Sequence, residues 1–180
     1  MWELDAGLEG RMPQLVEEQD LRGDLHLHSE WSDGNDPIEK MVESAVKLGF
    51  EYMALTDHSP SLVVANGLSP ERLANQLQVL QSLQDSCPIA VLAGSEVDIK
   101  RDGSLDYSDE VLAQLDVVVA SVHSSMGQDR STMTKRIIKA MSHPSVTIIG
   151  HLSTRLLGRR EPVDLDLEAV LQVALETGTA

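Results

Sequence analysis

The sequence predicts an α/β fold in which helices cover a parallel sheet. Apolar, β-rich runs recur at 25–28, 52–56, 89–99, 117–122 and 146–150. Segments whose apolar residues have helical spacing separate these runs. Such alternation of strand and helix favours parallel pairing, because a parallel connection needs a long crossover. With 180 residues, 42% of them hydrophobic, the chain is long enough to bury one core.

Residues 1–22 carry no clear period, and we interpret them as a lead-in segment with one short helix. From Gly23 the strand–helix rhythm begins, so we expect a single domain over 23–180. No internal repeat or low-complexity tract interrupts it. The chain ends directly after an expected helix C-terminus, where a further strand would begin. We therefore expect a barrel-like fold that is truncated after about five strand–helix units.

The first helix of this domain has clear start and stop signals. Asp36 is expected to cap it, with Pro37 in the first turn and Glu39 completing a near capping box. Apolar residues recur at helical spacing over 38–46, and Gly49 is placed to end the helix.

Four further helices are expected. The second begins at Ser69-Pro70, a short one covers 108–115, and another covers 130–141. The last runs from about Asp164 to Gly178. Its expected buried residues share one apolar face: Leu167, Val170, Leu171, Ala174 and Leu175.

The composition favours a reducing compartment, and we expect a cytoplasmic protein. Cys87 is the only cysteine of the sequence, so an internal disulfide is excluded. No run approaches the ~18 apolar residues of a membrane span, and residues 1–20 lack a signal-peptide pattern. The net charge of −15 opposes non-specific binding to nucleic acid or to an anionic membrane.

Basic residues are concentrated in one part of this acidic chain. Residues 121–160 hold seven basic side chains and one acidic side chain. Lys135, Arg136 and Lys139 fit the solvated face of a helix. A second, tight cluster follows closely after His151 and consists of Arg155, Arg159 and Arg160.

Histidines and a carboxylate fall at the carboxyl ends of the expected strands. The His26-x-His28 pair projects from one side of an extended segment. A lone histidine in such a place is more often a hydrogen-bonded core residue, but here five of the six histidines share the position; His143 does not, and we take it as structural. Because parallel strands bring these ends to one face, we expect a metal site there. Its expected ligands are His26, His28, His58, Glu96, His123 and His151.

Three aspartates near these ligands have two interpretations each. Asp33 is either a ligand or a residue that shapes its loop. Asp24 and Asp57 either orient imidazoles from behind the metal or satisfy local backbone donors.

The ligand types indicate the chemistry. Imidazole and carboxylate suit Zn, Mn or Fe, and so many ligands suggest two or three ions with Glu96 as a bridge. The sequence contains no serine nucleophile elbow, Walker loop or dinucleotide fingerprint, so hydrolysis by metal-activated water is the economical mechanism. The three clustered arginines would hold an anionic substrate such as a phosphate.

These motifs resemble the polymerase and histidinol phosphatase (PHP) family of metal-dependent phosphoesterases. The matching stretches are 24–28, 32–34, 56–58, 94–96, 121–123 and 150–151. The resemblance implies a distorted (β/α)7 barrel with a trinuclear site. It also implies that His26, His28 and Glu96 hold the first metal, Glu96, His123 and His151 the second, and Asp33 with His58 the third.

Within the family, the sequence is most similar to the C-terminal PHP domain of bacterial family X DNA polymerases, on stretches 64–69, 94–99, 102–107 and 155–162. This likeness implies a Mn-dependent 3′–5′ exonuclease that processes DNA 3′ ends in repair, beside a polymerase domain. A phosphatase of the histidinol-phosphate kind and a non-catalytic module are the alternatives. The late Asp-x-His motif of the family has no counterpart in these 180 residues, which would leave the first and third ions one ligand short.

Overall fold

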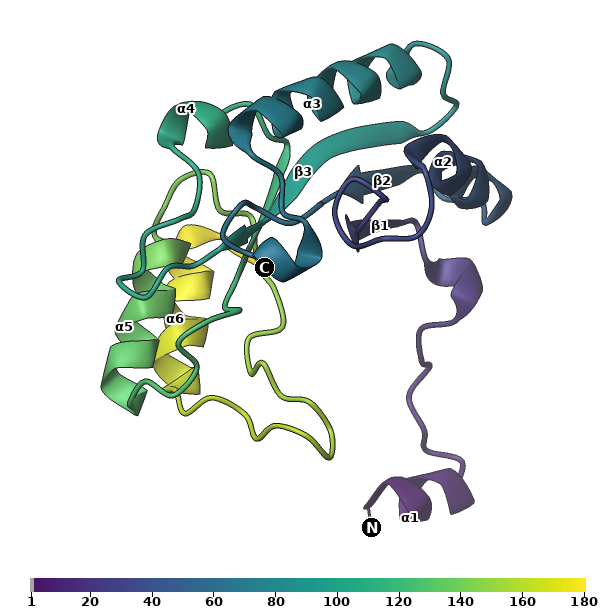
Figure 1. Cartoon of the computed structure of the whole chain (residues 1–180). Coiled ribbons are helices and arrows are strands. Elements are labelled where there is room, and N and C mark those ends of the chain that lie inside the picture. The colour runs from purple at the N-terminus through teal and green to yellow at the C-terminus, as the bar shows by residue number, and fades with distance from the viewer. Residues whose placement is uncertain (1) are drawn as a thin grey trace.

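The computed structural model of the protein describes residues 2–180 and contains one five-stranded parallel sheet. The strands follow the order of the sequence, β1-β2-β3-β4-β5. They are β1 (Gly23–Leu27), β2 (Tyr52–Leu55), β3 (Ala90–Asp98), β4 (Val117–Ser121) and β5 (Ile148–Ile149). Each predicted run overlaps its strand, which confirms the α/β prediction. Figure 1 shows that the sheet curls into a half-barrel with helices outside it.

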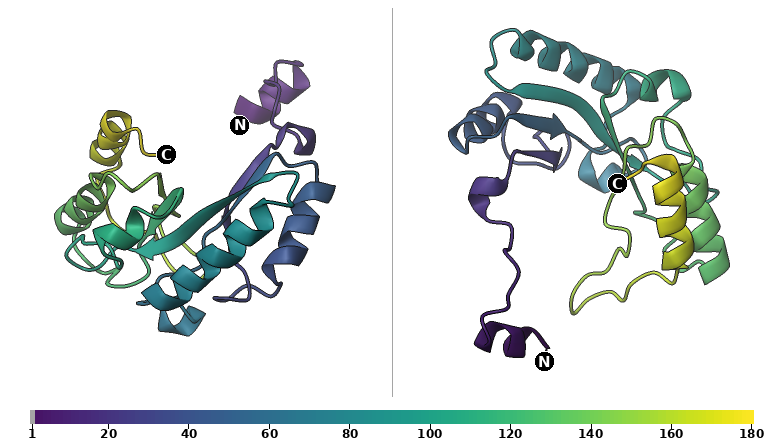
Figure 2. Two further views of the ribbon diagram at one scale, coloured as in Figure 1. Left: turned by 90° about the horizontal axis from the view of Figure 1, so that it is seen from above. Right: turned by 180° about the vertical axis from the view of Figure 1, so that it is seen from behind.

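The five helices after residue 22 overlap the segments where apolar periodicity predicts them, and α1 (Trp2–Leu8) lies in the lead-in segment. The five are α2 (Ile38–Lys47), α3 (Pro70–Gln84), α4 (Asp109–Leu112), α5 (Arg130–Met141) and α6 (Leu167–Thr177), with 3-10 turns at Glu18–Asp20 and Val63–Ala65. Helices α2 and α3 cover the first three strands, whereas α5 and α6 lie side by side at the other end of the sheet (Figures 1 and 2). Helix α1 lies apart from the sheet at the N-terminal start of the lead-in segment (Figure 1). None of the helices that the structure describes is long and apolar enough to cross a membrane.

Strand β3 is the longest and joins two halves of the sheet. Its first part, 90–93, pairs with β2, and its second part, 94–98, pairs with β4. Gly94 lies at the change of partner, where an added Cβ would stand 2.9 Å from the carbonyl oxygens of Leu55 and Val117. The carboxyl end of β3, which carries Glu96, therefore lies in the middle of the curved sheet.

Two of the three apolar clusters in the described residues pack helices against the sheet. One packs α5 against β3 and β4, with Val97, Val118, Met133 and Ile137 buried. The other packs α2 and α3 against β2, around residues such as Met53. Both clusters are almost entirely aliphatic, as the 3% aromatic content requires. The packed layer leaves the carboxyl ends of the strands free to carry polar groups.

The predicted start of α2 is wrong by one residue. Pro37 is the N-cap, in an extended conformation, and no side chain caps the helix. Asp36 instead forms an ion pair with Lys40. The predicted ends at Gly49 and Gly178 are confirmed, since both glycines have positive φ. Helix α3 begins at Ser69-Pro70 as predicted, and Ser69 caps it by accepting a hydrogen bond from the backbone N–H of Arg72.

Helix α6 buries less than its apolar pattern predicts. It begins at Leu167 with Asp166 as N-cap, later than expected. Val170 is buried, but Leu167, Leu171 and Leu175 are exposed. The reason is that α6 packs mainly on α5, and these three leucines lie on the part of its apolar face that remains uncovered.

Candidate metal centre

Glu96 is the centre of the candidate site. Its side chain is only 2% exposed, and both carboxylate oxygens face imidazole nitrogens. Oε2 lies 3.2 Å from Nε2 of His26, 3.3 Å from Nε2 of His28 and 3.1 Å from Nδ1 of His58. Oε1 lies 3.2 Å from Nε2 of His123 and 2.9 Å from Nε2 of His151. The structure thus brings together one carboxylate and the five histidines that follow the strand ends.

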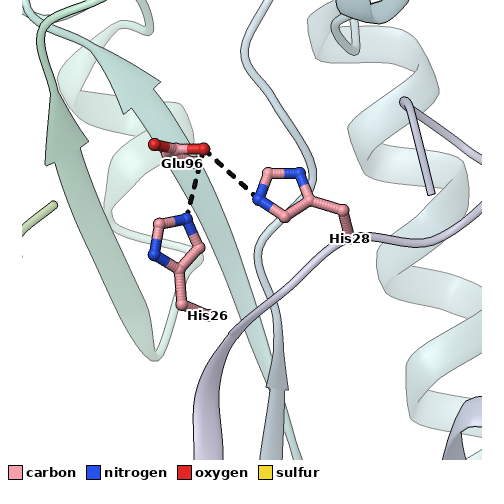
Figure 3. Close-up of side chains that lie close together, drawn as sticks. All are labelled: His26, His28 and Glu96. Atoms are coloured by element: carbon pink, nitrogen blue, oxygen red, sulfur yellow. Dashed lines mark ion pairs between the residues drawn. The ribbon is translucent and has the colours of Figure 1, made fainter. Parts of the chain in front are cut away.

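The His26-x-His28 pair reaches Glu96 from one side, as its spacing predicts. His26 lies in β1 and His28 directly after it, and their ring centroids are 5.2 Å apart. Figure 3 shows both rings directed at the same carboxylate oxygen. This oxygen therefore has two imidazole nitrogens from one strand end beside it.

Asp33 extends the cluster away from Glu96. Its Oδ1 lies 3.2 Å from Nδ1 of His28, and its Oδ2 lies 3.6 Å from Nε2 of His58. The loop that carries it is packed closely, because a Cβ added at Gly34 would stand 2.1 Å from the carbonyl oxygen of His28. The geometry places Asp33 as a candidate ligand between two imidazoles.

Asp57 holds the loop between His28 and Asp33. It is buried and accepts hydrogen bonds from Ser29 N at 2.8 Å, Ser29 Oγ at 2.6 Å, Gln76 Nε2 at 2.6 Å and Ser32 Oγ. Its bonding partners therefore include no imidazole. Its role here is to support the ligand-bearing loop.

Asp24 contacts the backbone of its own strand. It accepts a hydrogen bond from the backbone N–H of His26 at 2.9 Å. Of the two interpretations for Asp24, the geometry supports satisfaction of a local backbone donor.

Asp98 is a carboxylate that the sequence reasoning missed. It lies two residues after Glu96 on β3, is buried, and accepts a hydrogen bond from Nδ1 of His123. A strand places residues i and i+2 on one face, so the Glu96-x-Asp98 spacing was the available signal. This bond leaves Nε2 of His123 directed at Glu96, the tautomer that a metal ligand needs.

His151 reaches the cluster through an unusual backbone turn. Its φ of 24° lies in the left-handed region. The preceding Gly150 has no room for a side chain, because a Cβ there would stand 2.2 Å from Ser121 Oγ. The close packing at Gly150 and the turn at His151 together bring the ring to Glu96.

The surroundings set the protonation states of the metal-free cluster. Burial raises the pKa of Glu96, but hydrogen bonds with imidazoles outweigh burial and hold the pKa far below its ordinary value. Burial lowers the pKa of His123, whereas Asp98 and Glu96 raise it by more, to about 9. For His28, the attraction of Glu96 and Asp33 likewise exceeds burial and raises the pKa. For His58, burial prevails and lowers the pKa. The cluster thus combines an ionised carboxylate with imidazoles whose pKa values are shifted in different directions.

The donor set fits divalent metal ions. Nδ1 of His28 and Nδ1 of His58 are buried and lack hydrogen bonds, although carboxylate oxygens lie 3.2 and 3.1 Å away. Two ligand atoms at about 2.1 Å from a tetrahedral ion are roughly 3.4 Å apart, which matches these separations. Three triads have ligand atoms within 4.8 Å of one another: His26–His28–Glu96, His28–Asp33–His58 and His58–Glu96–His123. Nitrogen and oxygen donors without thiolates suit Zn, Mn or Fe.

The clustered arginines lie outside this arrangement. Arg155, Arg159 and Arg160 belong to the long loop between β5 and α6, which extends away from the sheet (Figures 1 and 2). Arg160 donates from Nε to the carbonyl of Thr154 at 2.8 Å, within the same loop. Among residues 2–180, none of the three guanidiniums forms an ion pair. The structure therefore leaves their part in substrate binding as a prediction.

Comparison with known proteins supports the motif-based assignment. Residues 24–177 match the profile of the PHP domain. The chain belongs to the PHP family. It is 44% identical over 168 residues to the DNA polymerase/3′-5′ exonuclease PolX of Bacillus subtilis, a match that covers 93% of this chain and 30% of that protein. This confirms the resemblance to the PHP domain of family X polymerases.

Other relatives are named as probable phosphatases. The chain is 31% identical over 162 residues to a probable phosphatase of Syntrophotalea carbinolica, covering 87% of this chain and 62% of that protein. It is 32% identical over 161 residues to a probable phosphatase of Thermoanaerobacter pseudethanolicus, covering 86% and 61%. The chain thus spans less than two thirds of each of these relatives.

Proposed function

We propose that this PHP domain is a metal-dependent phosphoesterase that removes nucleotides from DNA 3′ ends in the 3′–5′ direction, as part of repair. The observation that carries the proposal is Glu96, a buried carboxylate with imidazoles at both of its oxygens. The 44% identity to a protein named as a polymerase and 3′–5′ exonuclease favours DNA as the substrate. A cytoplasmic location and a polymerase domain in the same protein belong to this proposal.

In this proposal the chain holds two or three divalent ions. His26, His28 and Glu96 are assigned to the first, Glu96, His123 and His151 to the second, and Asp33 with His58 to the third. Bound there, such ions would supply Lewis acidity toward phosphoryl oxygens and activate water at neutral pH. Glu96 would keep neighbouring ions close, because each of its oxygens faces a different set of imidazoles. Asp98 would fix the orientation of the His123 ring by accepting from Nδ1, so that Nε2 is the atom that faces the metal.

The arginine loop is assigned to the substrate. Arg155 and Arg159 are exposed, and guanidinium groups pair well with phosphate oxygens. The protein carries a net charge of −15, so local positive charge near the site would be needed to attract a polyanion.

A second candidate is a phosphatase for a small phosphorylated molecule. The relatives named as probable phosphatases favour it. Both functions use the same metal ligands. They differ in the substrate, which is a DNA 3′ end in one case and a small phosphorylated molecule in the other.

The deciding experiment measures metal content and two activities on one preparation. Single-stranded DNA labelled at its 5′ end reports 3′ shortening with added Mn²⁺, and histidinol phosphate reports phosphate release. Glu96→Gln removes the central charge at constant size, and Glu110→Gln, on the exposed face of α4, is the matched control. We expect the wild-type protein to shorten the DNA only when Mn²⁺ is added, and a phosphorothioate at the 3′-terminal linkage to slow this reaction. Glu96→Gln should abolish the shortening, and Glu110→Gln should retain it.

Other outcomes contradict the proposal in separate ways. Phosphate release without DNA shortening would favour the small-molecule phosphatase. Metal binding with neither activity would indicate a non-catalytic module. DNA shortening that survives Glu96→Gln would overturn the role given to this carboxylate.

A further inference from the structure

Arg136 is a buried cation that the metal cluster itself does not explain. It lies on α5 and is only 2% exposed, so the prediction that it belongs to a solvated helix face is wrong. The reason is that two loops fold over this turn of α5 and enclose the guanidinium. A buried arginine is costly unless its five N–H donors find acceptors.

The acceptors of Arg136 lie in two loops. Nε donates to the carbonyl of Lys100 at 2.9 Å, and Nη2 donates to the carbonyl of Ile99. Nη1 contacts the carbonyls of Ser124 at 3.0 Å and Ser125 at 3.4 Å. Nη1 also donates to Oε1 of Gln128 at 3.0 Å. One planar group therefore joins segments that are distant in the sequence.

The position of these acceptors in the chain is informative. Residues 99 and 100 are the first two after Asp98, and residues 124 and 125 are the first two after His123. Asp98 and His123 form the hydrogen bond that directs Nε2 of His123 at Glu96. The guanidinium thus connects the loops that follow β3 and β4, directly after Asp98 and His123. These two residues must keep their relative position for their hydrogen bond to form.

The arrangement is not an ordinary ion pair. Among residues 2–180, no carboxylate lies within ion-pair distance of Arg136, and its partners are main-chain and amide oxygens. Ser125, one of these partners, has a φ of 51°, in the left-handed region that a serine rarely adopts. Such a conformation persists where surrounding contacts over-determine it. The contacts from Arg136 supply that constraint at the start of the loop after His123.

We propose that Arg136 is a positioning residue for the metal centre. Its guanidinium holds the loops after β3 and β4 in the register at which Asp98 orients His123 toward Glu96. The proposal rests on the proposed function only in taking His123 as a metal ligand. Arg136 itself does not touch the metal, the substrate or the reacting atoms.

The test uses variants of the full 180-residue chain that separate the forked shape from the charge. Arg136→Ala removes both, and Arg136→Lys keeps the charge but cannot reach all the acceptors. Arg130→Ala is the control, because Arg130 lies on the same helix but is exposed and pairs with Asp166 at 3.6 Å. Circular dichroism establishes whether each variant is folded.

Two measurements report on His123 without an activity assay. The ¹⁵N shifts of its ring report which nitrogen carries the proton, and competition with a chromophoric chelator reports the affinity for Zn²⁺. We expect Arg136→Ala and Arg136→Lys to weaken Zn²⁺ binding about 10-fold to 100-fold, as loss of a supporting partner typically does. We also expect their His123 ¹⁵N shifts to move in the same direction as in Asp98→Asn. Arg130→Ala should change neither quantity.

Chemical rescue makes the test sharper. Added guanidinium, at concentrations far below those that unfold proteins, should restore Zn²⁺ affinity to Arg136→Ala. Methylammonium or sodium chloride at equal ionic strength should not. If Arg136→Ala does not fold, Arg136→Lys decides the question.

The overturning results are distinct from those for the proposed function. A folded Arg136→Lys with wild-type Zn²⁺ affinity and wild-type His123 shifts would overturn the inference. Weakened binding with unchanged His123 shifts would do so as well, since it would mean a merely structural role. Wild-type protein that binds no Zn²⁺ or Mn²⁺ would instead overturn the proposed metal centre.

Discussion

Nε2 of His151 lies 2.9 Å from Oε1 of Glu96, although 55 residues separate the two in the sequence. The contact closes the cluster, because His26, His28 and His58 occupy the other oxygen of the same carboxylate. One buried side chain therefore connects ligands from β1 to β5.

Replacing Glu96 should affect metal binding more than replacing any residue behind the ligands. Glu96→Gln keeps the size but removes the charge that attracts cations to both groups of imidazoles. We expect a loss of metal affinity greater than the roughly 10–100-fold typical of a supporting residue. Metal retained after dialysis, measured by plasma mass spectrometry, tests this. Full occupancy in Glu96→Gln would contradict the bridging role.

Asp57→Ala should destabilise the protein even without metal. It leaves the buried donors of Ser29, Ser32 and Gln76 without their acceptor. Each orphaned donor costs about 1–3 kcal/mol, so we expect the free energy of unfolding to fall by about 3 kcal/mol or more. Urea unfolding in the presence of a chelator measures it. Asp36→Ala, which removes an exposed ion pair with Lys40, should change the free energy by less than about 1 kcal/mol.

Gly34→Ala should disturb the first ligand loop. The new Cβ would stand 2.1 Å from the carbonyl oxygen of His28, so the backbone that carries this imidazole must shift. Overpacking of this kind costs typically about 1–3 kcal/mol, and we expect weaker metal binding as well. Gly127→Ala is the matched control, since an added Cβ there meets nothing within 4 Å. Equal stability and metal affinity in the two variants would show that the close approach at Gly34 has no consequence.

Metal binding should release protons near neutral pH and strengthen as the pH rises. The pKa of His123 is raised to about 9 because Asp98 and Glu96 outweigh the effect of burial. Below that pH the metal-free protein holds a proton on His123 that an incoming cation must displace. Affinity should therefore rise with pH until about 9. Calorimetry at pH 7 in buffers of different ionisation enthalpy counts the released protons.

A control identifies the source of these protons. His143 lies outside the cluster, with its Nε2 3.3 Å from Oδ1 of Asp109. His143→Asn should therefore leave the number of released protons unchanged. Binding without proton release in wild-type protein would contradict the raised pKa of His123.

The sequence by itself determined the α/β class, the strand order along the chain and the places where candidate ligands gather. The physical reason is that these features depend on local patterns. The spacing of apolar residues distinguishes strands from helices, and parallel strands bring their carboxyl ends to one edge of the sheet. His26, His28, His58, Glu96, His123 and His151 could therefore be predicted to meet. That they bind metal is still a prediction, as are the roles of the three loop arginines.

Only the tertiary structure decided which groups support these ligands. Asp98 faces His123 because of the register between β3 and β4, and Asp57 serves a loop and not a ring. Arg136 is buried because two loops fold over α5, although its helical position alone fits a solvated face. Such partners depend on contacts between segments that are distant in the chain, and a local pattern of residue types does not specify those contacts.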